Sequence, residues 1–291
     1  MAIIIDGKSV SADLREQLKL KVDSLKEKGI TPGLAVVLIG DDPASRSYVT
    51  AKEKSCGELG MYSRDIRMPA DSSEEELLDL IGKLNEDKDI DGILVQLPLP
   101  SHMDENKVIL GIDPSKDVDG FHPVSVGKMV LEQETFLPCT PHGILKLLEY
   151  CDIKPEGKKV VIVGRSNIVG KPLANLMIQK QSWGNATVTV CHTRTPDLKK
   201  ETLDADILIA AAGQPEMISG DMVKPGAVVI DVGVNRVPDD TRKRGYRLTG
   251  DVMFEEAEKV ASYITPVPGG VGPMTITMLL FNTIQSAQNR K

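Results

Sequence analysis

A tyrosine and a lysine four residues apart are the first side chains in this sequence with the chemistry for proton transfer. Tyr48 and Lys52 lie in "DDPASRSYVTAKEKSCGELGM", residues 41–61. This stretch predicts a helix, because Asp42 suits an N-cap and Gly60 suits a C-terminal stop. Residues four apart project from one face of a helix. On this stretch alone the pattern favours a solvated surface pair over a catalytic pair, because exposed lysine and tyrosine are common.

Polar residues at the ends of other predicted elements extend this set. Gln96 ends the predicted strand "DGILVQLPLP" (91–100), and Asp117 and Asp119 lie in "DVDGF". In an open parallel sheet, ligands bind beyond the carboxyl ends of the strands, and the helix of the tyrosine also begins after such an end. Taken singly, Gln96 suits a loop cap and Asp119 suits a turn. Their convergence with Lys52 predicts a site on one rim.

Strand-like and helical patterns alternate through the first half of the chain. Apolar residues at helical spacing end at Gly29, and "LAVVLIG" (34–40) is typical of a buried strand. Ser72 suits the cap of an amphipathic helix that precedes the strand 91–100. The order β-α-β-α-β predicts a parallel sheet. Residues 113–142 lack a regular pattern, and so long a connection indicates function.

A second alternation follows a predicted helix at 141–151. Four apolar runs are typical of buried parallel strands, at 158–164, 186–192, 206–213 and 226–235. The last segment is an apolar-faced helix that we expect to pack back onto the first domain. The sequence therefore predicts an α/β fold of two domains, each with a parallel-type sheet, and a cleft between them. Their predicted extents are 1–140 completed by the helix 272–291, and 141–271 as a Rossmann-like dinucleotide-binding domain.

The turn after the first of these later strands suits a pyrophosphate. "VVIVGRSNIVGKP" places Gly164 and Gly170 between a strand and a helix, where free amides meet the positive helix end. The spacing departs from G-x-G-x-x-G, since Ser166 stands where a middle glycine would. A purely structural turn therefore remains an alternative.

The end of the next strand favours NADP over NAD. NAD-specific sites commonly carry an acid there, whereas this strand ends in "CHTRT". Arg165 in the phosphate turn, with Thr193 or Arg194, has the donors to bind a 2′-phosphate. The alternative is that these are ordinary exposed loop residues.

Composition argues against several classes of partner. The chain has 291 residues, 41% of them hydrophobic, and a net charge of −7 without a long basic block. We therefore expect neither nucleic acid nor an anionic membrane as partner. No segment has the roughly 20 apolar residues of a membrane helix, and the N-terminus lacks the pattern of a signal peptide. Cysteines and histidines, four of each, show no metal-ligand spacing, which predicts a reduced cytoplasmic chain without a metal.

Several segments together resemble one family. They are "DDPASRSYVTAKEKS", "DGILVQLPLP", "DVDGFHP", "PCTPHG", "VVIVGRSNIVGKP", "VIDVGVNR" and "ITPVPGGVGPMT". In this order they identify the chain as a member of the bifunctional methylenetetrahydrofolate dehydrogenase/methenyltetrahydrofolate cyclohydrolase family, in its stand-alone bacterial-type form. The resemblance implies NADP-dependent oxidation of 5,10-methylenetetrahydrofolate to the methenyl form, followed by hydrolysis to 10-formyltetrahydrofolate. It also implies a cytoplasmic homodimer acting on tetrahydrofolate derivatives.

The resemblance implies a role for each polar residue of the first domain. Lys52 is the expected principal catalytic residue, and Tyr48 is expected to stack on the folate and help orient Lys52. Gln96 is expected to bond to Lys52 and tune its protonation, and Asp119 to bind the pterin ring. Ring opening needs an amine that is neutral near neutral pH. We expect burial and nearby Lys54 both to lower the lysine pKa.

The resemblance also implies which residues hold the cofactor. Gly164, Arg165 and Ser166 are expected to cradle the NADP phosphates, and Thr193 to face the 2′-phosphate. Val234 is expected to contact the cofactor through its backbone.

In "PGGVGP", Pro268, Gly269 and Gly272 are expected to contact the folate, because glycine allows close backbone approach. Ser125 departs from the family pattern, where Asn is expected, and we predict a mild change in loop hydrogen bonding. Cys139 lies near the site, and we interpret it as structural. The chemistry requires no metal and no covalent nucleophile.

Three alternatives remain open from the sequence. Short-chain dehydrogenases also use Y-x-x-x-K, but there the pair follows the glycine-rich turn, whereas here it precedes the turn. A non-catalytic NADP or folate sensor would most simply have lost Lys52 or Gln96, and both are present. A dehydrogenase without cyclohydrolase activity would keep the same residues.

Overall fold

The chain forms two compact units. The computed structural model describes residues 1–242 and 245–289. We call the part made of Met1–Ser11 and Thr140–Thr275 the six-stranded unit, and the part made of Ala12–Cys139 and the chain from Ile276 onward the three-stranded unit. Their boundaries fall within α1 (Gly7–Glu27), at the start of α6 (Cys139–Tyr150) and within α10 (Val271–Gln288).

The division differs from the predicted one at the N-terminus. The sequence placed all of 1–140 in one domain, whereas the first residues group with the six-stranded unit. The reason is β1 (Ile3–Ile4), which pairs in parallel with β11 (Tyr263–Ile264). A strand of two residues leaves no periodic pattern, so the sequence gives no sign of it.

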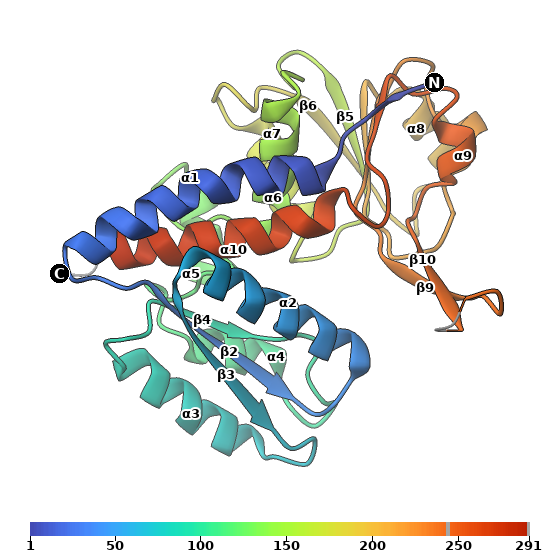
Figure 1. Ribbon diagram of the computed structural model, residues 1–291. Helices are drawn as coiled ribbons and strands as arrows, with labels where there is room; N and C mark the ends of the chain where they lie inside the picture. Colours follow the sequence, from blue (N-terminus) through green and yellow to red (C-terminus); the bar gives the residue numbers. More distant parts are fainter. Residues whose placement is uncertain (243–244, 290–291) are drawn as a thin grey trace. The chain divides into compact units, whose positions relative to one another are not determined.

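The three-stranded unit is a parallel sheet with helices on both faces. β2 (Gly33–Ile39) lies between β3 (Tyr62–Met68) and β4 (Gly92–Val95), and every residue of β2 is buried. Figure 1 shows α2 (Pro43–Leu59) on one side of this sheet and α3 (Glu74–Glu86) on the other. The sequence did not locate β3, because its alternating charged and half-buried side chains lack the apolar run that marks β2.

Helix caps agree with the sequence at α2 and differ by one residue at α3. The Asp42 side chain caps α2, and Gly60 ends it in the left-handed conformation with φ of 72°. At α3 the cap is Ser73 rather than the predicted Ser72. The Ser73 hydroxyl accepts from the Glu76 amide at 3.2 Å, and the Glu76 carboxylate accepts from the Ser73 amide at 2.8 Å. This reciprocal pairing, which Ser72 lies one residue too early to form, selects the cap.

The segment 113–142, expected to be irregular, contains a helix. After α4 (Glu105–Gly111) the chain turns into α5 (Pro123–Val130). The ring nitrogen Nδ1 of His122 accepts from the Val124 amide at 3.1 Å and caps this helix. Histidine is an uncommon cap, which is why the start of α5 was missed.

The six-stranded unit is the predicted doubly wound fold. Its strands are parallel and lie in the order β1-β11-β8-β7-β5-β6. The four longest strands of this sheet are β5 (Lys159–Val163), β6 (Thr187–Cys191), β7 (Ile207–Ala210) and β8 (Val228–Asp231). Figure 1 shows α7 (Gly170–Ile178) on one face, with α8 (Leu198–Leu203) and α9 (Phe254–Ala257) on the other. The predicted parallel α/β class is confirmed.

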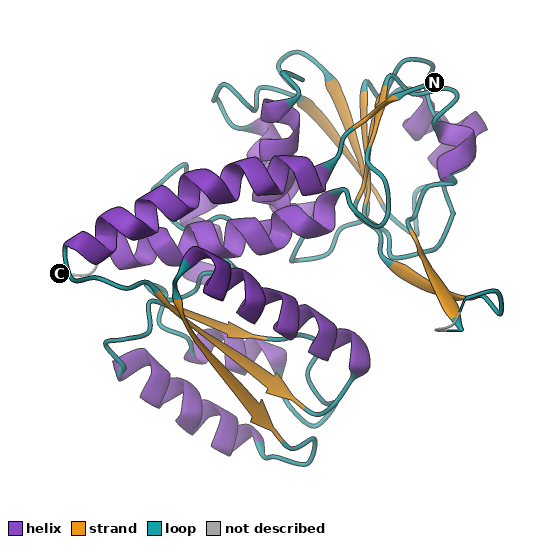
Figure 2. Cartoon of the chain, in the orientation of Figure 1, coloured by secondary structure: helices purple, strands orange, loops and turns teal. Residues whose placement is uncertain are grey.

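Two smaller elements complete this unit. The antiparallel hairpin of β9 (Asn235–Pro238) and β10 (Tyr246–Thr249) stands apart from the main sheet in Figure 2, and η1 (Gly220–Met222) is one 3₁₀ turn. Across the part of the chain that the structure describes, no helix has the length and apolar character needed to cross a membrane.

Candidate functional site

Lys52 lies inside the three-stranded unit, not on its surface. Its side chain projects from α2 and the residue is only 8% exposed. The Nζ atom donates to Oε1 of Gln96 at 2.9 Å. Gln96 follows β4 directly, and its own Nε2 donates to the Leu97 carbonyl at 2.8 Å, which turns Oε1 toward the lysine. The two residues are thus brought together at the carboxyl edge of the sheet.

Burial shifts the pKa of this lysine. The pKa of Lys52 is lowered, first by burial, and the negative charge of Asp119 acts in the opposite direction. The expected contribution of Lys54 is wrong. Lys54 is exposed and lies 3.8 Å from the carboxylate of Glu58, so its charge is screened by that carboxylate and by solvent.

Asp119 is the third member of this group. Burial raises the pKa of Asp119 to about 6, while the charge of Lys52 lowers it and the charge of Asp117 raises it. The thiol of Cys139 contacts the same carboxylate and donates to the Val118 carbonyl at 3.3 Å. Burial holds the pKa of this thiol well above its usual value, which suits a structural cysteine rather than a nucleophile.

The loop that carries Asp119 is fixed by a buried carboxylate beside it. Asp117 is 2% exposed and accepts from the amide of His122 at 2.9 Å and from the hydroxyl of Ser125 at 2.7 Å. A third donor is the Phe121 amide at 3.2 Å. Ser125 therefore satisfies a buried charge, which gives the departure from the family pattern a structural role.

Asn282 of α10 is a residue that the sequence reasoning missed. It is 1% exposed, and its Nδ2 donates to the carbonyls of Val118 at 2.8 Å and Leu137 at 2.9 Å. These bonds join the loop before Asp119 to the chain that leads into α6. An asparagine on the apolar face of a predicted helix was the available signal, because a buried amide needs partners.

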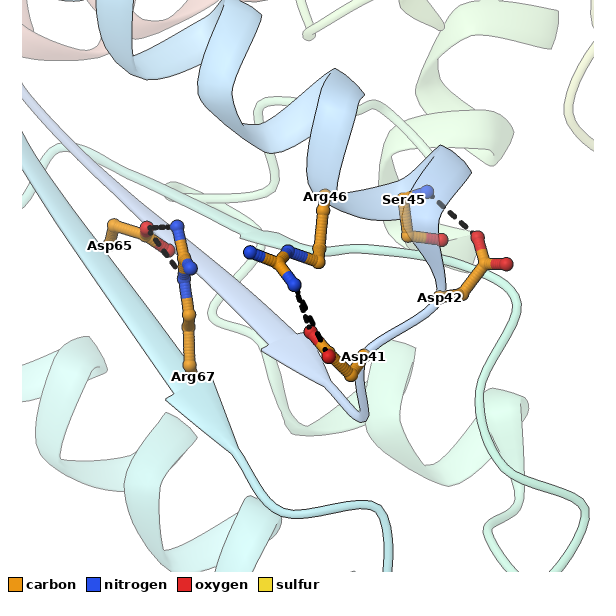
Figure 3. Close-up of polar contacts among 6 residues, drawn as sticks. All are labelled: Asp41, Asp42, Ser45, Arg46, Asp65 and Arg67. Atoms are coloured by element: carbon orange, nitrogen blue, oxygen red, sulfur yellow. Dashed lines mark hydrogen bonds and ion pairs between the residues drawn. The ribbon is translucent and has the colours of Figure 1, made fainter. Parts of the chain in front are cut away.

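Tyr48 lies one turn before Lys52 on α2 and is 41% exposed. The start of α2 is held by local contacts that Figure 3 shows. The Asp42 carboxylate accepts from the Ser45 amide at 2.8 Å, and the guanidinium nitrogen Nη1 of Arg46 lies 3.0 Å from Oδ1 of Asp41. An exposed ring above an anchored helix turn is available to a flat ligand.

In the six-stranded unit, the turn after β5 is built for close backbone approach. Gly164 has φ of 129°, and a Cβ there would lie 2.1 Å from the Ala211 carbonyl oxygen. A Cβ on Gly170 would lie 2.2 Å from the Gly164 oxygen. Ser166 replaces the middle glycine of the common motif, and its hydroxyl accepts from the Val169 amide at 3.1 Å. The turn is thus closed by tight backbone packing and by the Ser166 hydroxyl rather than by a middle glycine.

The other predicted cofactor residues follow strands of the same sheet. Arg165 is exposed in the turn after β5, and Thr193 and Arg194 are exposed after β6, the neighbouring strand. Val234 is 45% exposed after β8. Because the strands are parallel, these residues share the carboxyl edge of the sheet, where open α/β sheets bind nucleotides.

Pro268, Gly269 and Gly272 also belong to the six-stranded unit, and not to the unit of Lys52. Pro268 is exposed after a cis peptide bond, and the carbonyl of Gly269 accepts from the Lys8 amide at 3.1 Å. Gly272 lies in the first turn of α10, with open space where a side chain would be. Within the described ranges, no cluster of three or more His, Cys, Asp or Glu side chains is arranged to hold a metal ion.

Comparison with known families decides which enzymes this arrangement belongs to. The family "Tetrahydrofolate dehydrogenase/cyclohydrolase" matches twice, through its catalytic domain at residues 5–119 and its NAD(P)-binding domain at residues 138–291. The chain belongs to the tetrahydrofolate dehydrogenase/cyclohydrolase family. The short-chain dehydrogenase alternative is thereby excluded.

Relatives in the tetrahydrofolate dehydrogenase/cyclohydrolase family match along the whole chain. The "Bifunctional protein FolD" of Prosthecochloris aestuarii is 58% identical over 287 residues, which cover 98% of this chain and 97% of that protein. The crystal structure of the bifunctional FolD enzyme from Campylobacter jejuni has a TM-score of 0.94 at 50% identity and covers 100% of both chains. The Trypanosoma brucei enzyme, solved with NADP cofactor and inhibitor, has a TM-score of 0.94 at 40% identity, with 99% and 98% covered.

Membership of the tetrahydrofolate dehydrogenase/cyclohydrolase family confirms the predicted enzyme class. The chain is a folate-dependent oxidoreductase and hydrolase with an NAD(P)-binding domain.

Proposed function

We propose that this protein oxidises 5,10-methylenetetrahydrofolate with NADP and then hydrolyses the methenyl product to 10-formyltetrahydrofolate. The observation that carries the proposal is the buried Lys52 amine, 2.9 Å from Gln96 and electrostatically coupled to Asp119. A buried amine beside an amide oxygen and a carboxylate suits proton transfer near neutral pH. Family membership supplies the substrate class that such a site would serve.

In the hydrolytic step, Lys52 moves the protons. Water adds to the methenyl carbon, and the neutral amine of Lys52 accepts a proton from the attacking water. The resulting ammonium delivers a proton to the ring nitrogen that leaves, so that the ring opens to the formyl product. Gln96 holds the amine in place by accepting one N–H. The lowered pKa of Lys52 makes the neutral amine available for the first transfer.

Asp119 and Tyr48 bind the folate in this proposal. The carboxylate of Asp119 accepts from adjacent N–H donors of the pterin ring, and Tyr48 stacks on the ring from the exposed side of α2. With a pKa of about 6, Asp119 is largely ionised at neutral pH. Its charge also limits how far burial lowers the pKa of Lys52.

The turn after β5 fits a dinucleotide. At Gly164 and Gly170 the backbone packs so closely against other backbone that a Cβ at either position would clash, which fixes the shape of the turn. We assign Gly164, Arg165 and Ser166 to the phosphates, Thr193 to the 2′-phosphate and Val234 to a backbone contact. The Trypanosoma brucei relative with bound NADP supports this choice of cofactor. When bound, NADP takes up the hydride that the one-carbon unit of the folate loses.

We further propose that Pro268, Gly269 and Gly272 contact the folate, as the family resemblance implies. The protein is proposed to act in the cytoplasm as a homodimer. Light scattering of the purified protein measures its mass in solution, and a monomer at micromolar concentration would contradict the dimer.

The decisive experiment is a pair of assays on the purified protein. Dehydrogenase activity is measured with methylenetetrahydrofolate, separately with NADP and NAD. Hydrolysis is measured as the decay of the methenyl chromophore without any nucleotide. We expect both activities, with NADP preferred. Oxidation without hydrolysis would indicate the dehydrogenase-only alternative, and binding without either turnover would indicate the sensor.

A further inference from the structure

Two buried carboxylates in the six-stranded unit have no part in the mechanism above. Asp231 is the last residue of β8 and is 4% exposed, and Asp251 follows β10 and is fully buried at 0%. Burial of a carboxylate is costly unless hydrogen bonds compensate. The partners of these two acids therefore show what they hold in place.

Asp251 joins two loops at the carboxyl edge of the sheet. Its Oδ2 accepts from the amides of Ala212 at 2.6 Å and Gly213 at 2.9 Å, in the loop after β7. Its Oδ1 accepts from Nδ2 of Asn235 at 2.9 Å, the first residue of β9, which directly follows the loop after β8. Three donors thus satisfy this buried carboxylate and fix both segments to a single group.

Asp231 holds Asp251 in turn. Its Oδ1 accepts from the amides of Asp251 and Gly233 at 2.9 and 3.0 Å, and its Oδ2 accepts from the Val252 amide at 2.9 Å. Glycines surround the pair because nothing larger fits. A Cβ on Gly250 would lie 1.8 Å from Oδ2 of Asp231, and one on Gly233 would lie 2.1 Å from Oδ1 of Asp251.

The strand order indicates which part of the cofactor these loops face. The sheet runs β8-β7-β5-β6, with the phosphate turn after β5 and the 2′-phosphate residue Thr193 after β6. The half of the dinucleotide on the far side of the phosphates must then extend over β7 and β8. The loop after β7 also touches the phosphate turn, since the Ala211 carbonyl fills the space where Gly164 has no side chain.

We propose that Asp251 is a positioning residue for the nicotinamide half of NADP, acting through the loops after β7 and β8. The inference rests on the proposed NADP site and adds to it a side chain that touches neither cofactor nor folate. Asp251 sets the distance between Gly213 and Val234, the exposed points of these loops.

Exchange of donor and acceptor between two partners tests this role. In Asp251→Asn one carboxylate oxygen becomes an NH2 group, which is a hydrogen-bond donor. This donor must then face another donor, either Nδ2 of Asn235 or the backbone amides of Ala212 and Gly213. Asn235→Asp in the same chain reverses the polarity of the partner. The new amide at position 251 then donates to the new carboxylate at position 235, and the remaining oxygen at position 251 still accepts from Ala212 and Gly213. The double variant should restore what the single variant loses.

The single variant is expected to fold. The pKa of Asp231 is raised to about 7, first by burial and further by the charge of Asp251, while its hydrogen bonds to amides lower it. Removing the charge of Asp251 therefore relieves repulsion within the pair. Thermal unfolding of the variant checks that the fold is intact.

The experiment measures NADP binding by calorimetry, dehydrogenase kinetics, and hydrolysis without nucleotide. For Asp251→Asn we expect about a tenfold weaker Kd and a higher KM for NADP, because a charged hydrogen bond is lost. Hydrolysis should stay within about twofold of wild type. The double variant with Asn235→Asp should recover most of the affinity. Asp206→Asn is the matched control, because Asp206 accepts from the Lys159 amide at the opposite edge of the sheet.

Two results would overturn the inference. Wild-type NADP affinity in Asp251→Asn would show that the carboxylate does not position the loops. Equal loss of both activities without recovery in the double variant would show a general structural role. A wild-type protein that binds no NADP would instead overturn the proposed function, so the two failures are distinguishable.

Discussion

The candidate sites of the two units consist of different kinds of groups. In the three-stranded unit, Lys52 is buried and Asp119 is partly buried, and the pKa values of both are shifted by burial and by each other's charge. In the six-stranded unit, the cofactor edge consists of exposed residues such as Arg165 and of a backbone turn shaped by Gly164. The buried acids Asp231 and Asp251 lie behind that edge and hold it from within.

The difference follows from what each site has to do. Proton transfer needs a group whose pKa lies near the working pH, and an amine reaches that range only when it is removed from water. Phosphate binding needs fixed positive charge and free amides, which an exposed arginine and a helix end supply. Substitution of Lys52 in the first site should therefore change the rate of hydrolysis, whereas substitutions in the second site should change cofactor affinity.

The largest expected effect is loss of hydrolysis in Lys52→Met. The variant keeps an apolar side chain of similar length in the buried position but has no amine to move a proton. General acid–base catalysis contributes about 10²–10⁴-fold, so hydrolysis should fall by about that factor. NADP binding, measured by calorimetry, should stay within about twofold.

Lys54→Met is the matched control for this prediction. It lies two residues further along α2 and is exposed beside Glu58. Its hydrolysis rate should equal that of wild type. Wild-type hydrolysis in Lys52→Met would contradict the proposed mechanism, and equal losses in both variants would show that α2 had been disturbed as a whole.

Asp119→Asn should give the next largest effect. Loss of a charged acceptor should raise the KM for folate by about 10- to 100-fold, with NADP affinity unchanged. The charge of Asp119 raises the pKa of Lys52, so removing that charge should lower the lysine pKa. In the pH dependence of the hydrolysis rate, the limb that reports Lys52 should then move to lower pH. The limb near pH 6 that reports Asp119 itself should disappear. A profile that is unchanged between about pH 5 and 9 would contradict the coupling.

The sequence predicted the elements that carry strong patterns. The continuous apolar run of β2 and the Asp42 and Gly60 caps of α2 each have a local physical cause, and the structure agrees with them. The sequence did not predict β1 or β3. A strand of two residues has no periodicity, and a partly exposed strand with alternating charges has no apolar run.

The candidate site was predictable in its residues but not in its electrostatics. The sequence positions of Lys52 and Gln96 were enough to select them. The lowered pKa of Lys52, however, was attributed to both burial and Lys54, and the contribution of Lys54 was wrong. Charge spacing along a helix says nothing about which side chain solvent reaches. The support from Asn282 was also missed, because its partners lie more than a hundred residues away and its position on an apolar helix face does not identify them.

Arg165→Ala tests the cofactor site of the six-stranded unit. The guanidinium is exposed, so its bond to a 2′-phosphate should contribute less than a buried one, and NADP affinity should fall by about tenfold. NAD affinity should change little, because NAD lacks that phosphate. Calorimetry with both nucleotides measures the ratio, and Arg64→Ala, an exposed arginine paired with Asp87, is the control. Equal weakening of NADP and NAD would refute the assignment.

The smallest expected effect concerns Ser125→Ala, which removes one donor from the buried carboxylate of Asp117. Burial raises the pKa of Asp117, and the bond from Ser125 is the largest of the contributions that lower it. A carboxyl group with a raised folded-state pKa makes the fold less stable as pH rises from its unfolded pKa toward its folded one. Loss of the bond should raise that pKa further.

The consequence is a pH-dependent loss of stability rather than a uniform one. At pH 7 the buried charge is left with fewer donors, and Ser125→Ala should lower the free energy of unfolding by about 1–3 kcal/mol. Near pH 4 Asp117 is increasingly protonated in the fold, so the difference from wild type should shrink. Ser115→Ala removes a similar bond to the exposed Asp113 and should change little at either pH. A loss that stays constant from about pH 4 to 7 would mean that Ser125 acts through packing, and the loop that carries Asp119 would then not depend on a charge at Asp117.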